Sequence, residues 1–231
     1  MDAEESLARA GELIGDRRRL QMLMVLVDGQ AWPAGDLARS AGIQPATASY
    51  HLERLIAGGL LAVVPQGRHR YYRLASPAVA ELLEKLAALA PPAAAHSLRE
   101  SHRRDALRHG RTCYDHLAGR LGVAWTQAWV DRGFAHCASG EYTLTDAGAR
   151  WLERFGIAAR PGASIPHHAV DWTERVPHFA GPLAKAMTRR LFDAGWMERG
   201  PIPRSVRLTP FGEQQFRDFG AVLHDTRGGG R

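Results

Sequence analysis

The chain has 231 residues, of which 45% are apolar, and it carries a formal net charge of +6 and only two cysteines. This length and apolar share are enough for one or two conventional cores, which excludes an intrinsically disordered chain. Two cysteines are too few for a disulfide-stapled secreted fold, and the sequence shows neither a membrane-length apolar run nor a signal peptide. We therefore expect a cytoplasmic protein with free thiols and no membrane partner.

The basic charge is concentrated in one segment. Residues 1–90 carry ten basic and ten acidic side chains, so this half of the chain is neutral. Within residues 39–73, however, five arginines stand against Glu53 alone. A local basic patch of this kind indicates an acidic partner.

Four helices are expected first. Residues 1–14 have a helical composition, and "DRRRLQMLMVLVDG" predicts a helix that begins after an Asp16 N-cap. "AGDLARSAG" predicts a short helix broken by Gly42, and "QPATASYHLERLIAGG" a longer one that begins at Pro45 and ends at Gly58. The last two helices form a helix, a tight turn and a second helix.

A basic hairpin and an apolar helix follow. Residues 60–64 and 71–74 resemble strands, and "PQGRHR" between them contains turn formers, so we predict a β-hairpin with a basic tip. Ser76 and Pro77 then cap a helix with a one-sided apolar stripe. The stripe consists of Val79, Leu82, Leu83, Leu86 and Leu89.

A helix-turn-helix followed by a basic hairpin is typical of proteins that read double-stranded DNA, because the major groove admits one α-helix. A helical projection of residues 44–58 places Ala48, Leu52 and Leu55 inward and the polar side chains outward. The alternative interpretation is an ordinary amphipathic helix with a solvated face. The side chains predicted to contact DNA are Gln44, Thr47, Ser49, Tyr50, Arg54, Arg68, His69 and Arg70.

Residues 36–74 resemble the winged helix-turn-helix of the ArsR-type bacterial transcriptional repressors. The matching motifs are T-x-S-x-H-L-x-x-L-x-x-x-G-L and G-R-x-x-Y-Y-R-L. The resemblance implies a homodimer in which the first helix and the striped helix at 77–89 pair with their copies. The stripe of Val79, Leu82, Leu83, Leu86 and Leu89 would thus form the dimer interface. The dimer would bind a palindromic DNA operator and be released by an inducer. His51 matches a recurrent histidine of the family, and its half-inward position favours a structural role. "DLARSAG" lacks the cysteines of the arsenic and cadmium sensors, and "PAVAELLEKLAAL" lacks the His and Asp ligands of the zinc sensors.

An internal repeat organises the rest of the chain. Residues 116–134 match residues 178–196 at an offset of 62, and residues 144–156 match residues 208–220 at an offset of 64. We place the copies at 113–157 and 170–221 and expect each to be helix, helix, hairpin, helix. The predicted fold is mainly α with small β-hairpins (α+β): an N-terminal winged helix-turn-helix and a C-terminal pair of repeated winged-helix-like units.

The predicted domains follow from this repeat and from composition. Residues 1–90 form a winged helix-turn-helix domain for DNA binding and dimerisation, and the Pro- and Ala-rich residues 91–97 form a linker. Residues 98–231 form a sensor domain. Its tryptophans are expected in the core, although a cleft lined by several of them would suit an apolar inducer.

"RTCYDHLAG", residues 111–119, is interpreted as helical, which places Cys113 and His116 on one face. They could begin a metal or haem site, or a redox site. Zinc and haem iron both need further ligands, and the candidates are His109, His136, Cys137, His167, His168 and His178. His116 recurs as His178 whereas Cys113 aligns with Arg175, so a structural histidine is the competing interpretation.

The sequence thus predicts a dimeric repressor and not an enzyme. The repressor is expected to respond to an unidentified small-molecule, redox or metal effector. Its cofactor stays unknown. The alternative is a thiol- or metal-dependent enzyme, or a metal, haem or redox sensor, centred on Cys113 and His116. A third interpretation makes the winged units protein-interaction modules.

Overall fold

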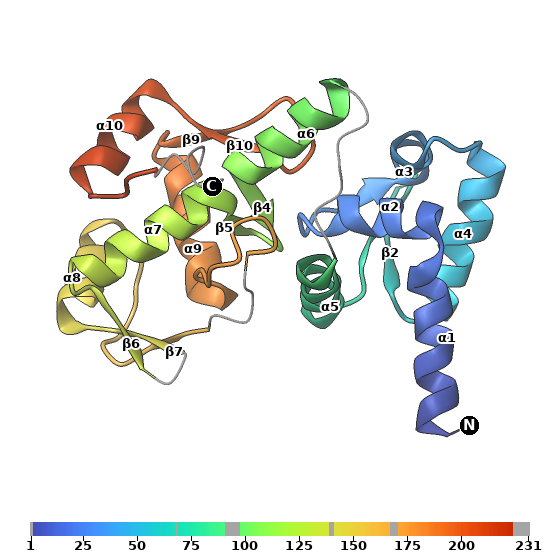
Figure 1. The fold of residues 1–231 in the computed structure, drawn as a ribbon, viewed down its shortest axis with the longest axis horizontal. Coiled ribbons are helices and arrows are strands. Elements are labelled where there is room, and N and C mark those ends of the chain that lie inside the picture. Colours follow the sequence, from blue (N-terminus) through green and yellow to red (C-terminus); the bar gives the residue numbers. More distant parts are fainter. Residues whose placement is uncertain (1, 68, 91–97, 139–140, 167–170, 224–231) are drawn as a thin grey trace, which may run out of the picture. The chain divides into compact units, whose positions relative to one another are not determined.

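The computed structural model describes residues 2–67, 69–90, 98–138, 141–166 and 171–223. The chain divides into two compact units, Met1–Leu83 and Glu84–Arg231 (Figure 1). This division falls inside helix α5 (Pro77–Leu89), whereas the predicted linker at 91–97 lies outside the described residues. In the described part of the chain, no helix is both long and apolar enough to cross a membrane.

Four helices precede the hairpin of the first unit, as predicted. They are α1 (Ala3–Gly15), α2 (Arg17–Leu26), α3 (Ala34–Ala41) and α4 (Pro45–Ala57). The Asp16 carboxylate accepts hydrogen bonds from the N–H groups of Arg18 and Arg19, both at 2.9 Å, and so caps α2. Gly42 has φ 62°, which ends α3 and begins the tight turn into α4.

The wing of the first unit is an antiparallel hairpin of β2 (Leu61–Gln66) and β3 (His69–Leu74). The sheet also contains a third strand, β1 (Trp32–Pro33), in the order β1-β3-β2. The sequence reading missed β1 because two residues are too few to show a strand periodicity. The core of the unit consists of fully buried aliphatic residues from helices and sheet, including Met22, Leu23, Leu26, Leu37, Leu52, Leu55 and Leu74.

The second unit continues with α6 and two copies of one arrangement. Its elements are α6 (Leu98–His109), β4 (Arg111–Cys113), β5 (His116–Ala118), α7 (Gly119–Asp131), β6 (Ala135–Ala138), β7 (Glu141–Leu144), α8 (Asp146–Arg154), β8 (Ser164–Ile165), α9 (Gly181–Asp193), β9 (Met197–Arg199), β10 (Val206–Leu208) and α10 (Pro210–Asp218). We call residues 116–156 the first copy and residues 178–220 the second copy.

Equivalent elements of the two copies have matching bounds. Helices α7 and α9 begin and end 62 residues apart, and α8 and α10 begin and end 64 residues apart. An antiparallel hairpin, β6–β7 or β9–β10, connects the helices of each copy. Thr145 and Thr209 cap the second helix by accepting hydrogen bonds from Gly148 and Gly212. Each copy is therefore helix, hairpin, helix.

The predicted first helix of each repeat was wrong. The residues directly before α7 form the hairpin β4–β5, in which Cys113 pairs with His116. The described residues 171–180, which precede α9, contain no helix. Tyr114 and Asp115 have φ values of 43° and 71°, so two left-handed residues reverse the chain where a helix was expected.

Aromatic side chains from both copies fill the core of the second unit. The Trp125 ring stacks on Phe219 with centroids 4.4 Å apart, and Trp129 is fully buried beside Trp151 at 5.3 Å. Trp196 lies edge-on to Trp125 at 6.1 Å. These tryptophans are therefore core residues, as expected, and the cavity beside Trp125 and Phe179 has a volume of only about 10 Å³.

Candidate functional site: a nucleic-acid interface and a buried polar network

Helix α4 is held against the first unit by its inner face. Ala48, Leu52 and Leu55 are at most 1% exposed, as the helical projection predicted. The opposite face is consequently fixed outward. The predicted DNA-contacting side chains of this segment, Gln44, Thr47, Ser49, Tyr50 and Arg54, are all exposed.

Two of these residues form a local cationic and aromatic patch. The Tyr50 side chain is 56% exposed, although a large aromatic ring is usually buried. The Arg54 guanidinium lies over this ring at 5.9 Å, one helical turn further along α4. An exposed phenol next to a cation can donate hydrogen bonds and supply positive charge to a phosphate or a base edge.

The wing supplies a second group of exposed polar side chains. His69 and Arg70 begin strand β3 and are both exposed. They pair in register with Gln66 and Pro65, so the hairpin fixes their backbone at the tip of the wing. Arg68, the third predicted wing residue, lies outside the described residues.

His51 has the structural surroundings that its half-inward position predicted. Its side chain is buried, and Nδ1 lies 3.5 Å from Arg19 Nη1. Arg19 also donates to the carbonyl oxygens of Leu13 at 2.8 Å and Glu12 at 2.7 Å. Arg19 of α2 thus connects His51 on α4 to the end of α1 from inside the unit.

The apolar stripe of α5 is divided between core and solvent. Val79 and Leu83 are buried, whereas Leu82, Leu86 and Leu89 are 41%, 42% and 82% exposed. An exposed row of leucines on one helix is characteristic of a surface that is covered in an assembly.

Cys113 and His116 face each other across the β4–β5 hairpin rather than along a helix. Cys113 is 3% exposed, and burial raises the pKa of its thiol well above the usual value. The thiol is therefore held protonated, which is the opposite of what a reactive cysteine needs. Cys137 is exposed.

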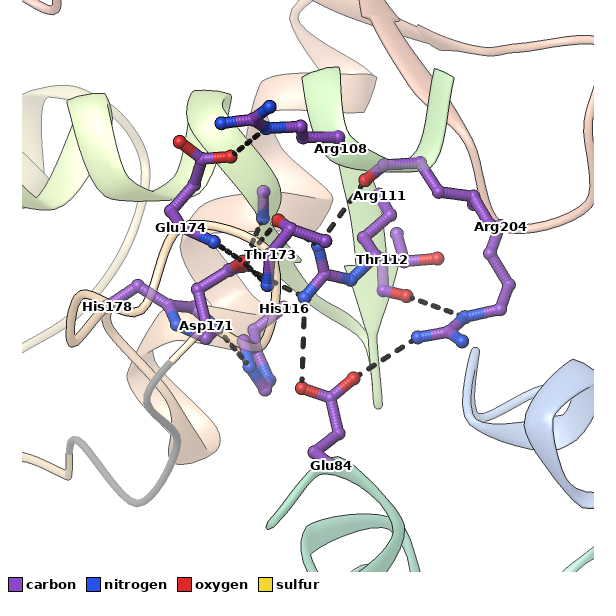
Figure 2. Close-up of polar contacts among 12 residues, drawn as sticks. Glu84, Arg108, Arg111, Thr112, His116, Asp171, Thr173, Glu174, His178 and Arg204 are labelled. Atoms are coloured by element: carbon purple, nitrogen blue, oxygen red, sulfur yellow. Dashed lines mark hydrogen bonds and ion pairs between the residues drawn. The ribbon is translucent and has the colours of Figure 1, made fainter. Parts of the chain in front are cut away.

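His116 instead meets His178, its equivalent in the second copy. The two Nε2 atoms lie 3.1 Å apart, and both side chains are buried (Figure 2). Burial lowers the pKa of His116 well below its ordinary value, and the proximity of His178 lowers it further. The His116 ring is accordingly held neutral where it contacts His178.

The two copies also exchange reciprocal hydrogen bonds next to this pair. Leu117 N–H donates to the Thr188 hydroxyl, and Phe179 N–H donates to the Thr126 hydroxyl, both at 2.9 Å. Leu117 and Phe179, like Thr126 and Thr188, are 62 residues apart. The copies therefore pack as equivalent partners around an approximate twofold axis.

A buried carboxylate completes the network, and sequence reasoning missed it. Asp171 is fully buried and accepts from Arg111 Nη2 at 2.9 Å and from Gly119 N–H at 2.6 Å (Figure 2). It also accepts from both the N–H and the hydroxyl of Thr173. Burial alone would raise the pKa of Asp171, but Arg111 and these hydrogen bonds hold it far below its ordinary value.

Arg111 joins this carboxylate to a second one. It lies 4.0 Å from Glu84, which belongs to the same unit and which also contacts Arg204 at 3.3 Å. Figure 2 shows Arg111 between the two acids. Its guanidinium also lies 4.8 Å from the Trp172 ring. Because every charge here is paired and shielded from solvent, the arrangement is a structural clamp.

In the described part of the chain, Cys113 and His116 do not gather the further ligands of a metal site. Within the described residues, no group of three or more His, Cys, Asp or Glu side chains is arranged to hold a metal ion. His167 and His168, two of the histidines that could have joined Cys113 and His116, lie outside the described residues.

Comparison with known proteins extends over both units. A helix-turn-helix domain family matches residues 14–64. The uncharacterized HTH-type transcriptional regulator YdfF of Bacillus subtilis is 37% identical over 215 residues, which cover 91% of this chain and 95% of that protein. The HTH-type transcriptional regulator CmtR of Mycobacterium tuberculosis is 36% identical over 83 residues, 36% of this chain and 70% of that protein.

Solved structures align with a smaller part of the chain. The cadmium metal-sensor CMTR from Mycobacterium tuberculosis is 31% identical, with a TM-score of 0.32, over 39% of this chain and 99% of that one. NolR from Sinorhizobium fredii is 26% identical, with a TM-score of 0.36, over 40% and 97%. The exposed α4 face, the wing and the relationship to the Bacillus protein through nearly the whole chain lead to one conclusion: this chain belongs to the HTH-type transcriptional regulators and is a DNA-binding regulator.

Proposed function

We propose that this regulator is a cytoplasmic homodimeric repressor, which binds a palindromic operator through α4 and the β2–β3 wing and is released when an effector binds the second unit. The observation that carries the proposal is the outward polar face of α4. Tyr50 and Arg54 are exposed there while Leu52 and Leu55 anchor the helix from within. The major groove accepts a helix presented in this way.

The proposed DNA contacts divide by chemistry. Gln44, Thr47, Ser49 and Tyr50 lie on the N-terminal half of the α4 segment, where side chains of recognition helices reach base edges. Arg54 and the wing residues Arg68, His69 and Arg70 would contact phosphates, which position the protein without reading sequence.

Dimerisation through α5 is supported by its exposed leucines. Leu82, Leu86 and Leu89 recur at spacings of four and three residues, so they lie on one side of the helix. Pairing this side with that of a second copy would remove an apolar surface from water. The ArsR-type resemblance implies the same pairing.

A sensing role for the second unit rests on its place in the protein. The match to the Bacillus relative covers 91% of this chain, so the repeated copies accompany the DNA-binding unit in another regulator. We interpret these copies as winged-helix-like units that have acquired a regulatory use. Catalysis by a Cys113 thiolate is disfavoured because burial raises the pKa of that thiol.

The test uses duplex DNA from the region upstream of the protein's own gene. Fluorescence anisotropy at several salt concentrations would compare the full chain with Arg54→Ala and Arg70→Ala. Each lost phosphate contact should weaken binding. It should also reduce, by about 1, the slope of log affinity against log salt concentration. Arg150, an exposed arginine on α8, provides the control Arg150→Ala, for which affinity and slope should stay unchanged.

Two results would contradict the proposal. If the folded Arg54→Ala and Arg70→Ala variants keep the wild-type affinity and salt dependence, α4 and the wing do not form the DNA-binding face. The dimer is tested by sedimentation of Leu86→Glu, which should be monomeric. A monomeric wild-type protein at micromolar concentration would overturn the pairing of α5.

A further inference from the structure

The second unit contains an open pocket that the repressor's DNA-binding machinery does not use. Its volume is about 340 Å³, within the range of about 300–1,000 Å³ that is usual for small-molecule sites. Helix α9 supplies most of the wall through Lys185, Thr188, Arg189 and Phe192. The β4–β5 hairpin adds Thr112 and Asp115, and β9 adds Arg199.

The pocket wall has a net positive charge. Lys185, Arg189 and Arg199 face a single acid, Asp115, whose Oδ2 lies 4.0 Å from Lys185 Nζ. Within the described part of the chain, the Arg189 side chain makes no hydrogen bond or ion pair. A cation in a concave wall that lacks an anionic partner attracts an anion from solution.

Aromatic rings and a buried hydroxyl orient the other two cations. Lys185 Nζ lies 3.9 Å from the centre of the Tyr114 ring, and the Arg199 guanidinium lies 5.0 Å from the Phe192 ring. Arg199 Nη1 also donates to the Thr112 hydroxyl at 3.2 Å. Lys185 and Arg199 are therefore held in place before a ligand arrives, which reduces the entropy lost on binding.

The first copy shows that these charges are not needed for packing. At an offset of 62, Lys185 corresponds to Val123, and Arg189 corresponds to Gln127. Phe192 corresponds to Val130, and Arg199 to Cys137. The histidine and threonine positions that hold the copies together are unchanged between them. Only the second copy has cations and an aromatic ring at these positions, so the pocket chemistry is specific to one side of a duplicated scaffold.

We infer that this pocket binds a small organic acid, with its carboxylate held by Lys185 and Arg189 and its apolar body against Phe192. Arginine forms paired hydrogen bonds with a carboxylate, and the partly buried Phe192 ring gives a compact hydrocarbon group a contact surface. The inference rests on the proposed function in one respect: the acid would be the effector to which the second unit responds.

The test is calorimetric titration of the full chain with phenylacetate and hexanoate. Phenylacetamide, which has the shape of phenylacetate without its charge, and inorganic phosphate, which has charge without an apolar body, are the comparison ligands. We expect saturable one-to-one binding of the acids and at least about tenfold weaker binding of phenylacetamide, as for the loss of a charge-assisted hydrogen bond.

Three variants locate the site. Arg189→Gln introduces the residue of the first copy and should weaken phenylacetate binding about tenfold or more. Asp115→Asn removes the acid that competes for Lys185 and should strengthen binding. Arg150→Ala, which removes an exposed arginine outside the pocket, should leave it unchanged.

Several outcomes would overturn the inference. The first is that neither acid binds saturably at millimolar concentration. The second is that phosphate binds as tightly as the acids, and the third is that the folded Arg189→Gln variant binds phenylacetate as tightly as the wild type. Adding phenylacetate to the DNA complex separates the two hypotheses. If phenylacetate binds the pocket but does not release DNA, the acid-binding site is supported and its role as the effector site is contradicted. Failure of selective DNA binding would overturn the proposed function alone.

Discussion

His116 and His178 occupy equivalent positions in the two copies and meet with their Nε2 atoms 3.1 Å apart. A hydrogen bond between two imidazole Nε2 atoms needs one proton between them, so one Nε2 donates and the other accepts. An approximately symmetric site therefore contains two equivalent residues in different roles, one donor and one acceptor. Because both rings are buried, this bond forms without competition from bulk water.

The first prediction concerns the coupling of the two histidines. His116→Leu should lower the free energy of unfolding by about 1–3 kcal/mol, because the Nε2 of His178 loses its hydrogen-bond partner in a buried site. His116→Leu/His178→Leu should cost less than the sum of the two single substitutions. Urea unfolding of the four proteins measures the coupling energy, and strict additivity would mean that the bond contributes nothing.

The second prediction is a pH dependence of stability. The pKa of His116 is lowered in the folded state, so the unfolded chain binds this proton at a higher pH than the folded protein does. The free energy of unfolding should therefore fall as the pH drops below about 6.5, by up to about 1.4 kcal/mol per pH unit for one histidine.

The measurement is urea unfolding at pH 7.5 and pH 5.5. Burial also lowers the pKa of His109, so the informative quantity is the difference between the wild type and His116→Leu. That variant should lose less stability on acidification. His136 is exposed, and His136→Leu should keep the wild-type dependence. An identical slope in His116→Leu and wild type would disprove the assignment.

The third prediction concerns the buried carboxylate. Asp171→Asn leaves Arg111 without its closest counter-charge in a buried site. It also replaces one of the two carboxylate oxygens that accept hydrogen bonds from Gly119 and Thr173 with an amide nitrogen. The expected loss of stability is about 3–5 kcal/mol, typical of a broken buried ion pair. Asp193, which is exposed at the end of α9, gives the matched control Asp193→Asn, with an expected change within about 0.5 kcal/mol. Thermal unfolding followed by circular dichroism compares the two variants, and equal midpoints would exclude the clamp.

The fourth prediction uses equivalent glycines. A Cβ at Gly212 would lie 1.7 Å from the Trp196 carbonyl oxygen, and one at Gly148 would lie 2.1 Å from that of Phe134. Either alanine variant should be destabilised by at least about 1–3 kcal/mol, because backbone must move to make room. Gly11, on the exposed helix α1, has no atom within 4 Å of its Cβ position, so Gly11→Ala should stabilise by about 0.5–1 kcal/mol. Calorimetric unfolding distinguishes a gain from a loss of stability. A stabilised Gly212→Ala variant would contradict the close approach of Gly212 to the Trp196 carbonyl.

The helices and the β2–β3 hairpin of the first unit could be predicted because their signals are local. Pro45 fixes the first turn of α4, and Gly42 and Gly58 lie directly at helix ends. The periodicity of Leu52 and Leu55 then determines which face of α4 is buried. Such features depend on neighbours within one or two turns, so a single sequence contains them.

The β4–β5 hairpin could not be predicted in the same way. Its two-residue turn is Tyr114-Asp115, whereas turns with two left-handed residues favour Asn-Gly or Asp-Gly. Without that signal, the three-residue spacing of Cys113 and His116 suggested one face of a helix. The same spacing also places two residues opposite each other across a tight hairpin.

The buried network lay beyond sequence reasoning for another reason. Arg111 and Asp171 are 60 residues apart, and no periodicity or motif links them. The recurrence of His116 as His178 did identify a position shared by the copies. Only their packing around a common axis shows that these residues bond to each other rather than repeat the same local contact.

The reciprocal bonds of Thr126 and Thr188 have a consequence for how this unit can change. In an association of two identical chains, every substitution occurs twice, so a charge added on one side is added on the other. Here both halves are encoded in one reading frame, and each can mutate alone. The second unit is in effect a covalently joined dimer, in which one half can acquire new chemistry while the contacts between the halves remain as they were.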